Sequence, residues 1–326
     1  ILSSGGTARY LIDAKIPVVK VSDFTNSPEI LEGRVKTLHP KIHGGILAKR
    51  SDEKHLKDIE INNLELIDLV VVNLYPFKKK VEEGCSWENA IENIDIGGPS
   101  MIRSAAKNHK DVSVLVKPSQ YKDFIEENKK GNVNEKYKAK LALEAFQHTA
   151  DYDTAIANWM SEKKDLIPSK HIESHPLIKK LRYGENPHQK AFWYGSSNIG
   201  WDSAIQLQGK ELSYNNLLDL ESALSTVLEF NKNRYVESSN AAVILKHNNP
   251  CGAAISSSIE DAFKKALECD PISAFGGIVA LNNVVNMDTA KQLSNIFLEC
   301  VVAPSFSKEA LAILETKKNL RLLELD

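Results

Sequence analysis

The chain has few cysteines and no closely spaced cysteine pair. Its 326 residues hold four cysteines and no Cys-x-x-Cys motif. Disulfide-rich scaffolds are dense in cysteine, and structural zinc sites use closely spaced cysteine pairs, so the sequence disfavours both. A reducing compartment such as the cytoplasm fits this composition. The four positions are Cys85, Cys251, Cys269 and Cys300.

Long apolar runs and an excess of charge of one sign are also missing. The longest apolar runs, near 69–72 and 241–245, fall far short of the roughly 20 residues that cross a bilayer. No signal-peptide pattern is recognisable. Lysine and arginine total 41 against 43 acidic residues, and the basic residues are scattered among acidic ones. We therefore expect a globular chain that binds neither membrane nor nucleic acid.

Apolar runs and helical periodicity alternate along the first half, which predicts a parallel α/β arrangement. Helical spacing predicts a helix over 51–62 and a long helix over 135–160, and Ser119 is a plausible N-cap for a short helix between them. The pattern breaks around Pro168, where we place a boundary between domains 1–168 and 169–326. Strands are predicted at 17–21, 67–73 and 112–116.

Strands and helices resume in the second half. Ile259, Ala262, Phe263 and Ala266 recur at helical spacing behind a capping Ser258, so a helix is expected to follow the loop that begins at Lys246. The predicted strands are 190–194, 241–245, 278–281, 301–303 and 320–325, and the predicted helices are 216–230, 259–267 and 307–318.

The first candidate site is the segment Ser3-Ser4-Gly5-Gly6-Thr7. Paired glycines between a strand and a helix expected over 8–14 allow backbone N–H groups to approach an anion, and Ser4 and Thr7 add hydroxyl donors. A phosphate is the natural ligand. The segment is neither a nucleotide P-loop nor a dinucleotide fingerprint, and a plain glycine turn remains open.

Two cations and a hydroxyl follow in Arg34, Lys36 and Thr37, within a segment of little regular character. They form either a second clamp on an anion or a solvated loop. Pro40 separates His39 from His43, so a helical metal pair is not expected.

Two further segments carry groups suited to acid/base chemistry. Asn73 and Tyr75 follow a predicted buried strand, where ligands bind in such sheets. Asp95-Ile96-Gly97-Gly98-Pro99 opens a helix that contains Lys107, with free N–H groups near its start. Tyrosine, aspartate, lysine and an anion-ready backbone make a coherent set. Asp95 as a plain helix cap remains open.

Lys246 and His247 directly follow the apolar run 241–245. A buried strand of this kind delivers its C-terminal residues into a ligand crevice. Lysine can stabilise an oxyanion, and histidine exchanges protons near neutral pH. The alternative is a strand that ends in a solvated turn, since Asn249-Pro250 and Cys251-Gly252 are turn-forming steps.

Eight segments together resemble one family over almost the whole chain. They are, in order, SSGGTARYL, EGRVKTLHPKIHGGILA, NLYPF, DIGGPSMIRSAAKNH, LRYGENPHQ, LSYNN, KHNNPCGAA and SAFGGIVA. The chain is identified by them as a member of the bifunctional purine-biosynthesis family of AICAR transformylase/IMP cyclohydrolase.

For the first domain, the resemblance implies a methylglyoxal-synthase-like fold that closes formyl-AICAR to IMP with loss of water, without cofactor or metal. Ser4, Gly5, Gly6 and Thr7 match the family's ribose-phosphate loop. The clamp corresponds to Arg34, Lys36 and Thr37. Further substrate contacts correspond to Asn73, Ile96, Gly97 and Gly98, and the catalytic positions to Lys36, Tyr75, Asp95 and Lys107.

For the second domain, the resemblance implies a cytidine-deaminase-like α/β fold that transfers a formyl group from 10-formyltetrahydrofolate to the 5-amino group of AICAR. His247 matches the general base and Lys246 its charge-stabilising partner. Substrate contacts correspond to Arg182, Tyr183, Asn216, Phe275, Gly276 and, more weakly, Glu299. The resemblance also implies a cytoplasmic homodimer.

Two rival functions are weighed against this one. A zinc deaminase needs Pro-Cys-x-x-Cys, and the segment after Pro250-Cys251 lacks the second cysteine. A sensor of a phosphorylated metabolite would need the phosphate-binding loop but no proton-transfer residues, so the presence of Tyr75, Asp95 and Lys107 argues against it.

Compared with the family, a first strand and helix are expected before Ile1 and a second half of the transformylase domain after Asp326. These residues alone are therefore expected to lack formyl transfer.

Overall fold

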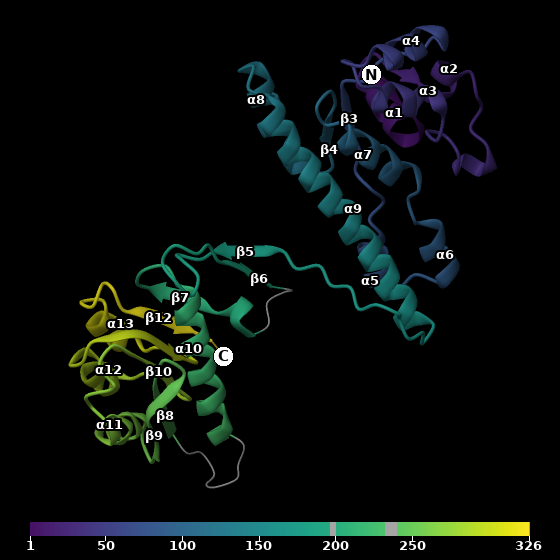
Figure 1. Ribbon diagram of the computed structural model, residues 1–326. Coiled ribbons are helices and arrows are strands. Elements are labelled where there is room, and N and C mark those ends of the chain that lie inside the picture. Colours follow the sequence, from purple (N-terminus) through teal and green to yellow (C-terminus); the bar gives the residue numbers. More distant parts are fainter. Residues whose placement is uncertain (196–199, 232–239, 326) are drawn as a thin grey trace. The chain divides into compact units, whose positions relative to one another are not determined.

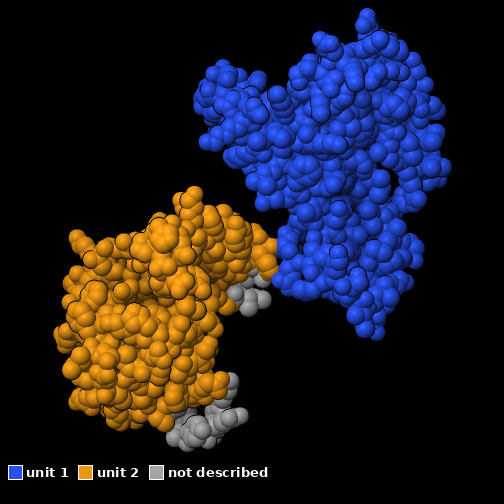
Figure 2. Space-filling view, viewed as in Figure 1, with its two compact units in different colours: residues 1–174 blue, residues 175–326 orange. Residues whose placement is uncertain are grey.

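The computed structural model describes residues 1–195, 200–231 and 240–325. Two compact units, Ile1–Ser174 and His175–Asp326, make up the chain (Figure 2). The domain boundary at 168/169 that we placed from the sequence remains a prediction.

Unit 1, Ile1–Ser174, contains two short parallel strand pairs. β1 (Leu2–Ser3) pairs with β2 (Val19–Lys20), and β3 (Leu69–Val71) pairs with β4 (Ser113–Leu115). The predicted parallel α/β arrangement is therefore confirmed, with strands shorter than their apolar runs. The buried side chains around β3 and β4 come from the strands and from two helices, and include Val70, Val114, Ile102, Ala105 and Leu141.

The longest element of unit 1 is α9 (Glu135–Lys163), a helix of 29 residues visible in Figure 1. It confirms the predicted long helix and extends it by three residues. The predicted helix over 51–62 is also confirmed, because Asp52 caps α4 (Glu53–Ile61). The remaining helices are α1 (Gly5–Asp13), α2 (Val21–Thr25), α3 (Pro40–Leu47), α5 (Phe77–Glu82), α6 (Trp87–Glu92), α7 (Gly97–Lys107) and α8 (Tyr121–Lys129).

The expected N-cap at Ser119 is wrong. Ser119 lies inside a 3-10 turn, Pro118–Gln120, that leads directly into α8. The side-chain oxygen of Gln120 accepts hydrogen bonds from the backbone N–H groups of Val116 and Lys117 at 2.7 and 3.1 Å. The Gln120 side chain therefore holds the turn that leads into α8.

Unit 2, His175–Asp326, is built on a six-stranded mixed sheet in the order β7-β12-β11-β10-β8-β9. β10, β11 and β12 run parallel to one another, while β8 is antiparallel to both β10 and β9. The strands are β7 (Ile205–Gln208), β8 (Asn240–Lys246), β9 (Asn249–Ser256), β10 (Gly277–Leu281), β11 (Leu298–Ala303) and β12 (Arg321–Glu324), and β5 (Leu177–Lys180) pairs separately with β6 (Phe192–Tyr194).

Helices cover both faces of this sheet. Side chains of a strand alternate between its two faces, and in β8 Ala241, Val243 and Leu245 pack with α10 (Tyr214–Leu228). Ala242 and Ile244 belong to the other face. That face is covered by α11 (Ile259–Cys269), α12 (Met287–Ser294) and α13 (Lys308–Leu314). Unit 2 is therefore a three-layer α/β/α sandwich, which agrees with the α/β fold that the family resemblance implies for the second domain.

The segment after His247 corrects one sequence expectation. A loop followed directly by a helix was expected, but β8 and β9 form a hairpin joined at His247 and Asn248. Both turn residues have positive φ, +53° and +59°, as in a type I′ turn. β9 is the edge strand of the sheet, where Pro250 is tolerated because an edge strand leaves N–H positions unpaired.

Candidate functional sites

The first anion-binding candidate is the start of α1. Gly5 and Gly6 are the first residues of this helix, with Ser4 as its N-cap in extended conformation. The first N–H groups of a helix have no carbonyl partner inside it and carry the positive end of its dipole. A Cβ added at Gly6 would have no atom within 4 Å, so there is open space in front of this turn. Gly5, Gly6 and Thr7 are exposed.

The loop of Arg34, Lys36 and Thr37 touches two helix N-termini. The Lys36 ammonium nitrogen lies 3.6 Å from a Cβ built on Gly5, at the start of α1. The Thr37 hydroxyl lies 2.7 Å from a Cβ built on Gly97, at the start of α7. One loop therefore brings a cation and a hydroxyl to two helix starts, an arrangement suited to a ligand with two electronegative groups.

Asp95 does cap α7, as the alternative reading of the sequence suggested. Its Oδ1 accepts the Gly98 N–H at 2.8 Å. Its own N–H donates at 2.9 Å to the hydroxyl of Tyr152, a buried residue of α9 that in turn donates to the Asn93 carbonyl at 3.3 Å. With Gly98 used in this way and Pro99 lacking an N–H, Gly97 supplies the free amide at this helix start. Sequence reasoning missed Tyr152, whose buried helical position was its only signal.

Tyr75 lies near the same helix start. The side chain of the preceding Leu74 is 2.8 Å from a Cβ built on Gly98. The Tyr75 phenol is exposed and, together with Asp95, contributes electrostatically to the raised pKa of Tyr152, which burial chiefly causes. The structure thus gathers Lys36, Thr37, Tyr75, Asp95 and Gly97 around the starts of α1 and α7.

Two predicted residues, Arg34 and Asn73, are bonded to other side chains of this chain. Arg34 forms an exposed ion pair with Glu92 of α6, and that hydrogen bond lowers the pKa of Glu92 and raises the pKa of Arg34. The Asn73 amide donates to the Tyr121 hydroxyl at 2.8 Å.

Lys107 is the last residue of the 11-residue α7. At 1.5 Å per residue it lies about 15 Å along the axis from Gly97, so the expected cluster of Tyr75, Asp95 and Lys107 does not form as one group. Its assignment as a catalytic residue remains a prediction.

Lys36 has a carboxylate neighbour that the sequence did not single out. Glu29 Oε2 lies 3.5 Å from the Lys36 nitrogen, and both side chains are partly exposed. The loop between them turns sharply, with φ of +54° at Leu31 and Glu32 and +87° at Gly33.

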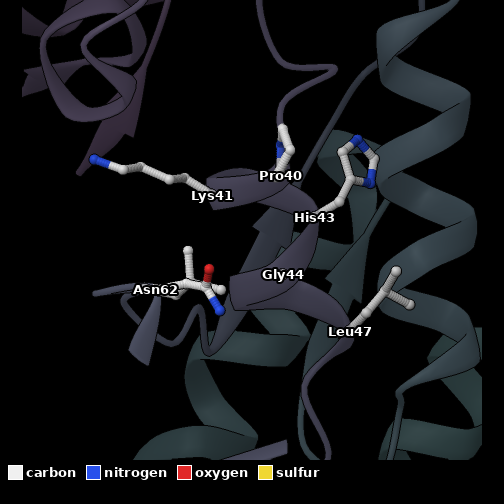
Figure 3. A pocket seen from close by; sticks show the side chains of 7 residues that line it. Pro40, Lys41, His43, Gly44, Leu47 and Asn62 are labelled. Atoms are coloured by element: carbon white, nitrogen blue, oxygen red, sulfur yellow. The ribbon is translucent and has the colours of Figure 1, made fainter. Parts of the chain in front are cut away.

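A hollow of about 570 Å³ lies along α3, but it contains none of the predicted site residues (Figure 3). His43, one of its lining residues, pairs its Nδ1 with the Ser104 hydroxyl of α7 at 3.0 Å, and its Nε2 is buried without a hydrogen-bond partner. Burial lowers the pKa of His43. Lys41 and His43 project away from each other, so the hollow offers no focused set of polar groups. It is lined by Pro40, Lys41, His43, Gly44, Leu47, Asn62 and Leu64.

In unit 2, Lys246 meets the predicted segment at Phe275 and Gly276. Its ammonium donates to the Phe275 carbonyl at 2.6 Å and lies 3.7 Å from a Cβ built on Gly276, which has a φ of +72°. The exposed rings of Phe275 and Phe297 are 5.2 Å apart and tilted by 43°. A cation and an open aromatic face therefore lie side by side.

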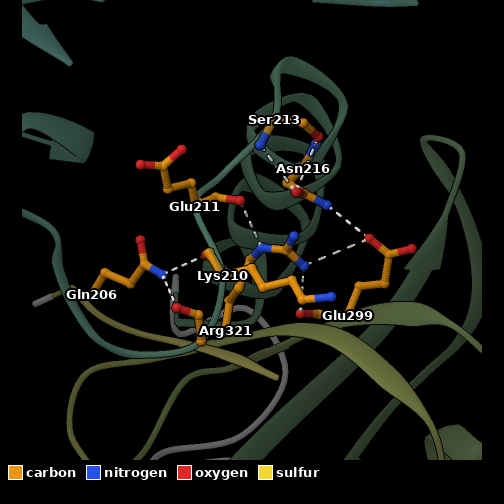
Figure 4. A network of polar contacts seen from close by, with 8 residues as sticks. Gln206, Lys210, Glu211, Ser213, Asn216, Glu299 and Arg321 are labelled. Carbon is orange, nitrogen blue, oxygen red and sulfur yellow. Dashed lines mark hydrogen bonds and ion pairs between the residues drawn. The ribbon is translucent and has the colours of Figure 1, made fainter. Parts of the chain in front are cut away.

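Asn216 and Glu299, both predicted substrate contacts, are joined directly. The Asn216 amide donates to Glu299 Oε2 at 2.9 Å, while its oxygen accepts the N–H of Ser213 in a capping box at the start of α10 (Figure 4). Arg321, only 6% exposed, lies 3.9 Å from the same carboxylate and donates to the Glu211 carbonyl at 3.2 Å. Sequence reasoning missed Arg321, which the strand pattern alone places in the core.

Arg182 and Tyr183 lie beside the start of α10. The Arg182 N–H donates to the Leu212 carbonyl at 3.0 Å, and the Tyr214 N–H donates to the Tyr183 carbonyl at 3.1 Å. The Arg182 guanidinium lies 5.4 Å from the centre of the Tyr183 ring. These backbone bonds tie the predicted LRYGENPHQ and LSYNN segments together.

Lys246, Glu299 and Arg321 do not lie where the sequence predicted a ligand crevice, at the carboxyl ends of parallel strands. Lys246 is at the carboxyl end of β8, but β10 runs antiparallel to it, so Gly277 is at an amino end. Glu299 sits in a bulge at the amino end of β11, and Arg321 begins β12. All three charged residues therefore lie at the same end of the mixed sheet, where β8 finishes and where β11 and β12 begin. Within the described residues no group of three or more potential metal ligands occurs.

The fold and these two clusters define a two-unit α/β protein that begins with an MGS-like domain, since residues 1–100, within unit 1, match the family model described as "MGS-like domain". Residues 105–326 match the model described as "AICARFT/IMPCHase bienzyme". The chain belongs to the AICARFT/IMPCHase bienzyme family. The family and the MGS-like first domain inferred from the sequence motifs are therefore confirmed.

Three similar proteins share one name. The chain is 76% identical over 99% of its length to the "Bifunctional purine biosynthesis protein PurH" of Prochlorococcus marinus (strain MIT 9301), and 74% identical over 100% to that of strain AS9601. It is 57% identical over 100% to the protein of the same name from Synechococcus sp. (strain CC9902). The chain spans 63% of the length of the first two relatives and 64% of the third.

Proposed function

We propose that the protein containing this chain carries out the last two steps of de novo IMP synthesis. A formyl group passes from 10-formyltetrahydrofolate to the 5-amino group of AICAR, and formyl-AICAR then closes to IMP with loss of water. Membership of the bienzyme family supports this function. The observation that carries it is the meeting of two helix N-termini on the loop of Lys36 and Thr37, which suits a ligand with a phosphate and a carbonyl oxygen.

We assign ring closure to unit 1. The ribose phosphate would bind at Ser4, Gly5, Gly6 and Thr7, where the free N–H groups and the nearby Lys36 cation favour an anion. The carboxamide nitrogen then attacks the formyl carbon and a carbon–nitrogen bond forms. The carbon–oxygen bond breaks, and the formyl oxygen leaves as water with one proton from the carboxamide nitrogen and one from the formamide nitrogen. No metal or cofactor is needed for this balance.

The residues around Gly97 can assist this step. Charge that develops on the formyl oxygen can be stabilised by the free Gly97 N–H and by Lys36. Asp95 uses Oδ1 to hold Gly98, which leaves Oδ2 for orienting the amide, and the exposed Tyr75 phenol can move a proton. Arg34, Asn73 and Ile96 would complete the binding surface. Lys107 would act on a part of the ligand that reaches along α7.

We assign formyl transfer to unit 2. The amine of AICAR is a poor nucleophile because its lone pair is delocalised into the imidazole ring, so removal of a proton by His247 favours attack. Lys246 lies where it can stabilise the oxyanion of the tetrahedral intermediate. Arg182, Tyr183, Asn216 and Glu299 would hold AICAR.

The open aromatic face of Phe275 and Phe297 fits the planar ring of a formyl donor, because offset stacking favours such contacts. Once bound, 10-formyltetrahydrofolate supplies the formyl group. Gly276 keeps this surface uncovered, since its positive φ disfavours a side chain.

We further propose that the protein acts as a homodimer in the cytoplasm. Family resemblance supports both statements. Among the helices of the described ranges, none is both long enough and apolar enough to span a membrane.

Ultraviolet absorbance during incubation of the whole protein with formyl-AICAR tests ring closure. IMP formation is expected, and tight ligand binding without turnover would instead identify a sensor. Gly6→Ala sharpens the test, because the new methyl would enter open space in the absence of ligand. It should weaken phosphate binding at least about tenfold while leaving thermal stability nearly unchanged, since the methyl would occupy the anion's position.

A further inference from the structure

The turn that carries His247 is attached to α10 by its neighbour. The backbone N–H of Asn248 donates to Asp219 Oδ1 of α10 at 2.8 Å. The side-chain amide of Asn248 forms the most hydrogen bonds when its nitrogen faces α10. In this orientation the nitrogen donates to Ser222 Oγ at 3.2 Å and to the same Asp219 oxygen at 2.8 Å. Asp219 therefore receives both donors of the residue that follows His247.

This attachment holds a backbone that its own sequence does not favour. His247 and Asn248 have φ of +53° and +59°. Left-handed backbone costs residues other than glycine roughly 1 kcal/mol each, and two-residue hairpin turns of this type prefer Asn-Gly. The turn residues are exposed and the following strand is a sheet edge, so packing alone does not define this conformation.

The same face of α10 serves the rest of the candidate site in unit 2. Asn216, Asp219 and Ser222 are spaced three residues apart, which puts them in one row along the helix. Asn216 holds Glu299, while Asp219 and Ser222 hold Asn248. A single rigid helix thus sets the position of the Glu299 carboxylate and of the His247 turn relative to each other.

We propose that Asp219 is a positioning residue for His247. Its carboxylate fixes the backbone of the turn, so that the imidazole keeps one location beside Lys246 when the amine of AICAR is attacked. This inference rests on the proposed role of His247 in formyl transfer. A general base must lie within hydrogen-bond reach of its proton, and a displacement of about 1 Å can lower a rate about 100-fold.

The test compares Asp219→Ala with Asp219→Asn in the whole protein. In Asp219→Ala, we expect the kcat of formyl transfer to fall about 10- to 100-fold with KM for AICAR nearly unchanged. Asp219→Asn keeps an oxygen acceptor and should restore most of that loss. The matched control is Glu221→Ala, which removes a neighbouring carboxylate that bonds Trp201 and Ser225 instead of the turn. It should leave kcat unchanged.

Amide hydrogen exchange at Asn248 provides a readout that does not depend on activity. Exchange should accelerate at least about tenfold in Asp219→Ala and stay near normal in Asp219→Asn and Glu221→Ala. If Asp219→Ala does not fold, Ser222→Ala should still lower kcat a few-fold.

Unchanged exchange at Asn248 in Asp219→Ala, or equal losses of kcat in Asp219→Ala and Glu221→Ala, would overturn the inference. A wild-type protein that transfers no formyl group, yet shows the predicted exchange pattern, would contradict the proposed function and not the anchoring of the turn.

Discussion

The two units hold their candidate sites by different means. In unit 1 the strands are only two or three residues long, and the candidate site is built around backbone amides at the starts of α1 and α7. In unit 2 a six-stranded sheet supports side chains that bond to one another, such as Asn216 with Glu299. We therefore expect unit 1 to be most sensitive to added methyl groups and unit 2 to the loss of single polar side chains.

The largest expected effect that tests this contrast is that of Gly97→Ala. Its Cβ would lie 2.7 Å from the Thr37 hydroxyl, so the loop or the helix start must shift. Alanine keeps the backbone N–H at position 97 but displaces it. Loss of a preorganised oxyanion donor costs about 100-fold in kcat, so we expect ring closure to slow by up to about that factor with formyl transfer preserved. Gly44→Ala is the control, because its Cβ would crowd Leu64 at 2.8 Å outside the site. Equal losses in the two variants would contradict the account.

Arg321→Met applies the complementary test to unit 2. Arg321 is buried, and its removal leaves the Glu211 carbonyl without this donor and the Glu299 carboxylate without its cation, although Asn216 still donates to Glu299. We expect a loss of about 2–3 kcal/mol in the free energy of unfolding, measured by chemical denaturation, with a higher KM for AICAR. Lys210→Met, which removes an exposed cation nearby, should change neither quantity. A fully stable Arg321→Met protein would refute the dependence of unit 2 on side-chain bonds.

An element of this fold could be predicted from the sequence where residues close together in the chain determine it. Helix α11 and its Ser258 cap were predictable because both depend on residues within one turn. Strand β9 was not, because its proline, glycine and alanines show no alternation and its pairing with β8 defines it.

The site divides in the same way. Motif spacing identified Lys36, Thr37 and Gly97, and the structure brings them together. Tyr152 and Asp219 escaped notice, because each acts on a residue tens of positions away in the sequence. Such contacts exist only after tertiary folding.

Acidification should destabilise unit 1 more than unit 2, and we expect this effect to be smaller than those of the two substitutions. The partnerless buried histidine nitrogens of the described residues belong to His43 and His148, both in unit 1. Burial lowers the pKa of each below its ordinary value of 6.5. The unfolded chain then binds more protons than the folded one below pH 6.5, so folding stability is lost as pH falls through that value.

Hydrogen exchange on the whole protein at pH 7.5 and 5.5 measures this difference. Peptides of unit 1 should become less protected at the lower pH than those of unit 2, after correction for the intrinsic exchange rate. His43→Gln should reduce the dependence. A larger loss of protection in unit 2 would contradict the assignment.

The smallest effect is expected from Glu92→Gln. The change frees Arg34 from its exposed ion pair, so anionic substrate should bind slightly better, with KM in ring closure falling about two- to threefold at low salt and less at high salt. Glu88→Gln, on the same helix, is the control. A rise in KM would show that Glu92 positions Arg34 for the ligand instead of competing with it.

The central claim is that each unit carries its own site, and His247→Ala in the whole protein tests it most directly. Both activities should be measured on one preparation, with formyl-AICAR supplied for ring closure and with AICAR and the formyl donor for transfer. The account predicts that formyl transfer falls at least about 100-fold while ring closure stays within about twofold of the wild type. Equal losses of both activities would contradict it.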